Sequence, residues 1–195
     1  MVGFLRGLSL LNAGVWLGAA VFMFVVALTI FTDAGVDRLL GARPEKGLAG
    51  QIFFHRFYLL QYICAGTAAL LLFLEWKIGK LAFPKWRFFT LLLISGLVLG
   101  GGLWLSPKLA GLLKEKYPSH FQPSAMATPQ RGKLLENAKR AEADHARWHR
   151  VSEGSYAATM LLLLIYFTAT ARQSAAAKKP RKAPVKKEVT LASLR

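Results

Sequence analysis

The sequence predicts an all-α integral membrane protein, a four-helix transmembrane bundle with a long fourth helix that extends out of the membrane and a disordered basic C-terminal tail. The chain has 195 residues, of which 54% are hydrophobic, yet its formal charge is +16. The polar residues must therefore be concentrated outside apolar segments. Windows without Asp, Glu, Lys, Arg or His occupy residues 7–32, 57–74, 88–105 and 154–171.

The length of these windows indicates membrane spans. Each has 18 residues or more, and a helix of that length rises roughly 27 Å, close to the ~30 Å hydrocarbon core of a bilayer. None shows the 3.6-residue alternation of a soluble core helix, which argues against a soluble domain. We expect a transmembrane domain over residues 1–171, with spans at about 8–32, 56–76, 87–105 and 152–171.

The first span and the single cysteine each have an alternative interpretation. The first apolar run is about twice the usual length of a signal-peptide core, and VALTIFTDAG lacks a small-x-small cleavage site. We therefore interpret this run as a retained helix. Cys64 is the only cysteine, so no internal disulfide can form, and its place inside the second span predicts a small packing residue.

Charge in the connections favours one orientation. Four spans put both termini on one side, which carries 13 Lys and Arg residues, and the opposite side also carries 13. Nine of the latter lie in the long third connection, whereas positive-inside bias is read from short connections and helix ends. The compact WKIGKLAFPKWR connection and the basic tail therefore favour cytoplasmic termini.

The tail over residues 172–195 is rich in Lys and Arg and has two prolines, which predicts disorder. It is interpreted as a solvated topology anchor or as a segment that docks on anionic lipid headgroups. No aromatic residue interrupts the basic run to stack on a base, which argues against nucleic acid as a partner.

Small residues predict how the spans pack. Helix association in lipid depends on close approach of backbones, and the first and third spans each contain a Gly-x-x-x-Gly pattern. The predicted packing residues are Gly14, Gly18, Gly96 and Gly100.

The third connection, residues 107–150, is expected to be largely helical outside the membrane. Residues 107–116 predict a short amphipathic helix on the bilayer surface, followed by a loop rich in Pro and Ser. Thr128-Pro129 is typical of a helix start. No breaker follows before Gly154, so we expect one helix from about residue 129 to 171, roughly 65 Å long, or a bend near residues 152–154.

Chemistry-bearing residues are sparse. The spans contain no ionisable group, which counts against a self-contained ion-coupled transporter and against acid/base catalysis in the membrane, and no residue is assigned a catalytic role. The residues Glu142, His145, His149 and Glu153 recur at spacings of three and four and so share one helical face. That face is either a solvated surface or a transition-metal site. Haem is a weaker alternative that rests on His55 and His149.

The chain also resembles a family across residues 8–167. LLNAGVWLGAAVFMFVVALTIF, FFHRFYLLQYICAG, GLWLSPKL and RWHRVSEGSY are similar to the four helix motifs of a bacterial domain of unknown function related to eukaryotic transmembrane protein 205. The residues that match its signatures include Trp104, Pro107, His149 and Ser152. His55 and Tyr156 depart from it, since the family usually has proline and asparagine there.

The resemblance implies a four-span protein, here of the bacterial inner membrane, without an established molecular activity. Its eukaryotic members are associated with handling or export of metal-containing drugs. Three functions stay open: an accessory or scaffold bundle, as a homo-oligomer or with a membrane-complex partner; a pore or exporter component for small solutes or metal species; and a metal- or haem-binding redox protein.

Overall fold

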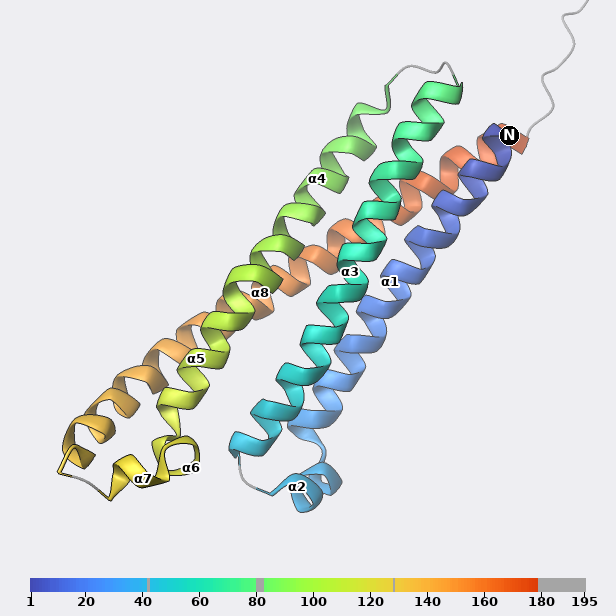
Figure 1. Cartoon of the computed structure of the whole chain (residues 1–195). Coiled ribbons are helices and arrows are strands. Elements are labelled where there is room, and N and C mark those ends of the chain that lie inside the picture. The colour runs from blue at the N-terminus through green and yellow to red at the C-terminus, as the bar shows by residue number, and fades with distance from the viewer. Residues whose placement is uncertain (42, 80–82, 128, 179–195) are drawn as a thin grey trace, which may run out of the picture.

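The computed structural model describes residues 1–41, 43–79, 83–127 and 129–178, and in these ranges all regular structure is helical (Figure 1). The elements are α1 (Val2–Thr32), α2 (Ala34–Leu40), α3 (Arg43–Gly79), α4 (Lys85–Leu99), the π-helical segment η1 (Gly100–Leu105), α5 (Ser106–Lys116), α6 (Pro118–Phe121), α7 (Pro123–Met126) and α8 (Arg131–Lys178).

Four of these helical runs are long and apolar enough to cross a membrane, which confirms the predicted fold class. They are Val2–Thr32, Pro44–Gly79, Lys85–Lys116 and Arg131–Ala175. Large apolar side chains such as Phe22 and Leu161 point outward and are 69% and 60% exposed. A helix that is apolar on its outer as well as its inner face is suited to lipid rather than to water.

The first connection is shorter than the predicted spans imply, because α3 begins at Arg43 rather than near residue 56. Asp33 starts α2 by accepting hydrogen bonds from the backbone N–H groups of Gly35 and Val36, which is the usual role of aspartate before a helix. Gly41, at φ +70°, ends α2. The connection therefore folds tightly at the end of the bundle opposite the start of α1 (Figure 1).

The helix predicted over residues 107–116 is found as α5, but it continues the third span instead of forming a separate element. The structure joins α4, η1 and α5 into one helical run, and Pro107, which has no N–H to donate, lies directly after the π-helical segment. Leu113 of α5 is buried, and a Cβ on Gly47 of α3 would lie only 2.8 Å from it. The expected loop that follows contains two single-turn helices, α6 and α7.

The fourth helix confirms the expectation of one continuous element. α8 has 48 residues and runs without interruption from Arg131 through Gly154 to Lys178. It starts two residues after the predicted Pro129, and Thr128 lies outside the described residues. The prediction that disorder begins at residue 172 is wrong for residues 172–178, which are helical, and the rest of the tail lies outside the described residues.

The core lies where α1, α3, α4 and α8 meet. Trp16 of α1 is fully buried and packs edge-on against Tyr166 of α8, with ring centroids 6.5 Å apart. Ile94 of α4 and Leu163 of α8 are also fully buried. Cys64 is buried in the same cluster, as the packing interpretation predicts.

The glycines that allow close packing differ from the predicted ones. A Cβ on Gly18, Gly96 or Gly100 would meet no atom within 4 Å, and one on Gly14 would meet only Phe167, at 3.6 Å. Within the described chain, Gly18, Gly96 and Gly100 therefore make no close contact with another helix, and their role in helix packing stays a prediction. Close approach occurs instead at the next two glycines of η1.

At η1, the rings of Tyr58 and Tyr62 from α3 lie directly on the backbone of Gly101 and Gly102. A Cβ on Gly101 would lie 2.6 Å from the Tyr58 hydroxyl, and one on Gly102 would collide with the Tyr62 hydroxyl. Only glycine fits at these two positions without a shift of the tyrosines. We call these four residues the glycine–tyrosine contact.

Candidate functional site

An ion pair is buried inside the bundle at the end where α1 begins and α8 ends. Glu75 lies in the last turns of α3 and Arg87 in the first turn of α4, on either side of a short connection. Arg87 Nη1 donates to Glu75 Oε2 at 2.8 Å, and the two side chains are only 2% and 7% exposed. Such burial is unusual, because each charge loses its hydration.

The other two spanning helices complete this site. The Ser9 hydroxyl of α1 donates to Glu75 Oε1. Arg87 Nη1 also donates to Gln173 Oε1 of α8, at 2.8 Å. We call Ser9, Glu75, Arg87 and Gln173 the Glu75–Arg87 cluster. One side chain from each of the four spanning helices therefore enters one polar network.

The surroundings of the cluster are aromatic on one side. The guanidinium carbon of Arg87 lies 5.7 Å from the centroid of the Tyr166 ring, a cation–π distance. Ser174, next to Gln173, donates to the backbone oxygen of Arg6 at 3.3 Å. This bond holds the last turns of α8 against the start of α1, beside the cluster.

Sequence reasoning missed this site. It predicted no ionisable group inside the spans, whereas the structure buries Glu75 and Arg87 there. The uncharged windows end at residue 74 and begin again at residue 88, one position short of each charge. The sequence did contain a signal for the pair. Glu75 and Arg87 have opposite charges and lie near the ends of two helices that a short connection joins, so the two side chains are expected to lie side by side.

Further polar contacts join the helices deeper in the bundle. Trp16 Nε1 donates to Gln61 Oε1 at 3.0 Å, and Asn12 Nδ2 donates to the Cys64 carbonyl at 3.0 Å. The Tyr156 hydroxyl donates to the carbonyl of Ala20. Buried polar groups in a membrane require such partners, so these contacts fix which faces of α1, α3 and α8 meet.

The His/Glu face of α8 lies outside the core. The rings of His145 and His149 have centroids 5.8 Å apart, and His149 Nδ1 lies 3.1 Å from Glu153 Oε1. Glu142 is instead 3.0 Å from Lys116 Nζ of α5. Burial, followed by the charges of His149 and Lys116, lowers the pKa of His145 from its ordinary 6.5.

This geometry gives no support to a metal centre. In the part of the chain that the structure describes, no three His, Cys, Asp or Glu side chains gather as a metal-binding group. Glu142, one of the predicted ligands, is instead paired with the ammonium group of Lys116. The metal and haem interpretations thus rest on sequence spacing alone.

Two of the matched signature regions meet at an aromatic cluster near the far end of the bundle. Trp104 of η1 and Trp148 of α8 pack edge-on with centroids 5.1 Å apart. Lys108 Nζ of α5 lies 3.9 Å from the Trp148 ring centroid and 5.2 Å from that of Trp104. Trp104 is 55% exposed, as suits an indole at the membrane–water boundary.

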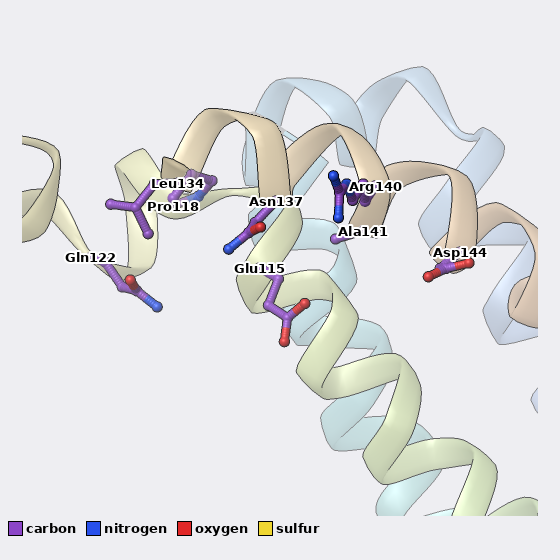
Figure 2. A pocket seen from close by; sticks show the side chains of 8 residues that line it. All are labelled: Glu115, Pro118, Gln122, Leu134, Asn137, Arg140, Ala141 and Asp144. Carbon is purple, nitrogen blue, oxygen red and sulfur yellow. The ribbon is translucent and has the colours of Figure 1, made fainter. Parts of the chain in front are cut away.

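A hollow of about 390 Å³ lies farther along α5 and α8. Figure 2 shows Glu115 from α5 below Asn137, Arg140 and Asp144 from α8, with Gln122 beyond the last turn of α6. The lining mixes both charge signs and amides and contains no arrangement of nucleophile and base. The hollow is therefore a polar surface depression rather than a catalytic centre.

The fold and the buried cluster define a multi-pass helical membrane protein with a polar network inside its bundle. Comparison of sequences gives the family: the domain of unknown function DUF4149 matches residues 11–118, more than half of the chain, and the chain belongs to this family. The matched region contains Glu75, Arg87 and the glycine–tyrosine contact, whereas α8 lies beyond it. No curated protein and no solved structure matches the chain.

Proposed function

We propose that the protein is a small accessory or scaffold bundle whose docking surface is formed by α5 and the first half of α8. The observation that carries this proposal is the two-helix arm, residues 106–116 and 131–150, in which Ala141 and Leu113 are buried while charged side chains line the outside. Lys116 and Glu142 join the two helices. A preformed polar surface attached to a spanning helix suits a partner protein.

The interior of the bundle supports the same proposal. Trp16, Tyr166, Ile94 and Leu163 fill the core with less than 2% exposure, and the polar groups described above bond from helix to helix. Such an interior holds four helices in one arrangement. We infer that partner binding, including binding of a second copy, takes place on the outer surfaces.

We further propose the setting in which this bundle works. A bacterial inner membrane, cytoplasmic termini and a relation to eukaryotic transmembrane protein 205 are supported by the helix motifs and by the charge of the short connections. The basic tail would then face the anionic cytoplasmic leaflet and bind its headgroups, each basic residue adding ~1 kcal/mol.

The test of the scaffold proposal is site-specific crosslinking in cells combined with native mass spectrometry. A photo-crosslinking amino acid at Asn137, in the hollow of Figure 2, should give a discrete adduct with a second copy or a defined partner. The matched control is the same amino acid at Leu161, which is exposed on the lipid face. A strict monomer with equal labelling at both sites would contradict the proposal.

A second candidate, a pore or exporter component for small solutes or metal species, is favoured by the buried Glu75–Arg87 pair. Ionisable residues inside membrane bundles commonly mark substrate pathways. Its test is flux through vesicles that contain wild-type protein, Arg87→Lys or His149→Ala. Equal fluxes for all three proteins would dismiss both residues from transport.

A further inference from the structure

One edge of the Arg87 guanidinium has hydrogen-bond donors but no acceptor. Nη1 donates hydrogen bonds to both Glu75 and Gln173. Nε and Nη2, in contrast, are buried without a hydrogen-bond partner among the described residues. These two nitrogens point the same way and form the fork with which arginine binds a carboxylate or phosphate through two parallel bonds. Buried donors are rarely left unpaired, so this edge requires an acceptor.

The charge around the fork indicates the sign of that acceptor. Arg6 lies one helical turn from Ser9, and its Nε is likewise buried without a partner among the described residues. Arg6 and Arg87 carry two positive charges, and Glu75 supplies one negative charge. Glu75 offsets only one of these charges, so this end of the bundle stays positive, which favours an oxyanion such as a phosphodiester as the acceptor.

The position of the fork indicates where the oxyanion comes from. Arg87 lies in the first turn of α4, at the end of the bundle where α1 begins and α8 ends, and next to Trp86, which is 67% exposed. Trp76 and Lys77 flank Glu75 on α3, with Lys77 Nζ 4.9 Å from the Trp76 ring. Exposed tryptophans and lysines are typical of the headgroup level of a bilayer. A phosphate at this level belongs to a lipid.

We propose that Arg87 binds the phosphate of an anionic phospholipid headgroup through Nε and Nη2, and that Gln173 covers this site. Gln173 lies in the last turns of α8, held to α1 by the bond from Ser174 to Arg6. A small displacement of this turn opens the guanidinium to the headgroup region. The phosphate oxygens then take the free edge, while Glu75 keeps its bond to Nη1 and holds the fork in place.

The test uses the full-length protein in mild detergent with phosphatidylglycerol, followed by native mass spectrometry of retained lipid. Arg87→Lys keeps the charge but removes the fork, and we expect it to bind phosphatidylglycerol about tenfold more weakly. The matched control, Arg172→Lys, makes the same change on the exposed side of α8 near the same end and should bind as the wild type does. Equal lipid retention by folded Arg87→Lys and wild type would overturn the proposal.

If Arg87→Lys does not fold, the variant Gln173→Ala tests the lipid-binding proposal. Gln173 bonds to Nη1 and not to the fork, so its removal leaves Nε and Nη2 unchanged but opens the buried guanidinium toward the headgroup region, and retention of phosphatidylglycerol should rise several-fold. A purely structural cluster would give unchanged or weaker retention, and either result would then overturn the proposal. A parallel titration with inorganic phosphate separates the two sources: a loss in Arg87→Lys seen only with inorganic phosphate would assign the fork to free phosphate and refute the lipid.

Discussion

At the end of the bundle where α1 begins and α8 ends, four helices meet through charged and polar side chains, whereas toward the opposite end α3 and η1 meet through two glycines and two tyrosines. The first contact depends on the pairing of Glu75 with Arg87, and the second depends on the absence of any side chain at Gly101 and Gly102. Electrostatic pairing tolerates small shifts but not the loss of a partner. Steric fit tolerates neither an added atom nor a change of register.

The largest expected effect comes from removing one partner of the buried pair. Glu75→Ala leaves Arg87 charged and unpaired in the bundle and should destabilise the protein by about 3–5 kcal/mol. The double variant Glu75→Leu with Arg87→Met removes both charges and should lose much less. Unfolding in mixed detergent micelles measures both, and a double variant as unstable as the single one would refute the importance of the pair.

The glycine–tyrosine contact should be broken by one methyl group. Gly102→Ala puts a Cβ against Tyr62 and should cost about 1–3 kcal/mol. Its control is Gly96→Ala, where a Cβ meets nothing within 4 Å, and where the change should stabilise the helix by ~0.5–1 kcal/mol. The same unfolding assay applies, and equal effects at the two glycines would rule out the steric contact.

A smaller effect is expected at the hydrogen bond between Trp16 and Gln61, which lies at the level of the glycine–tyrosine contact because Gln61 stands between Tyr58 and Tyr62 on α3. A double-mutant cycle with Trp16→Phe and Gln61→Leu should give a coupling energy near ~0.6 kcal/mol and at most about 1.7 kcal/mol, as for other bonds between membrane helices. Additive single effects would show that this bond does not couple α1 to α3.

The smallest expected effect is the contribution of His145, on the arm, to the dependence of stability on pH. The folded protein lowers the pKa of His145 below its ordinary 6.5, so the unfolded chain binds the proton more readily. Stability contributed by this group is therefore lost as pH falls from above 6.5 through the lowered pKa. His149→Ala removes one of the causes and should raise the pKa of His145, as followed by NMR titration of the imidazole. An unchanged titration would refute the coupling.

The fold class followed from the sequence because lipid imposes a simple rule: each span must be apolar and long, and four segments obey it. The continuity of α8 was also predictable, since no breaker stands between residues 131 and 154. The close contacts were harder to predict. Gly96 and Gly100 satisfy a spacing rule, but which glycine faces a neighbour depends on helix rotation, and the π-helical turn at η1 changes that rotation.

The candidate site was missed for a related reason. Windows without charge end where a charge begins, so Glu75 and Arg87 were treated as boundary residues, although the domain bounds already placed both within the spans. Their burial depends on the covering of that end by α1 and by residues 172–178 of α8. The composition of the tail favours disorder, yet its first residues continue α8, where Gln173 and Ser174 bond to Arg87 and to the backbone of Arg6.

The unbroken α8 has a consequence for how the two ends of this helix move. With 48 residues it is roughly 72 Å long at 1.5 Å per residue, and it carries Asn137 near one end and Gln173 near the other. A helix without a hinge rotates and translates as a unit. A rotation of the arm about the axis of α8 would therefore also move Gln173 relative to Arg87, at the opposite end of the same helix.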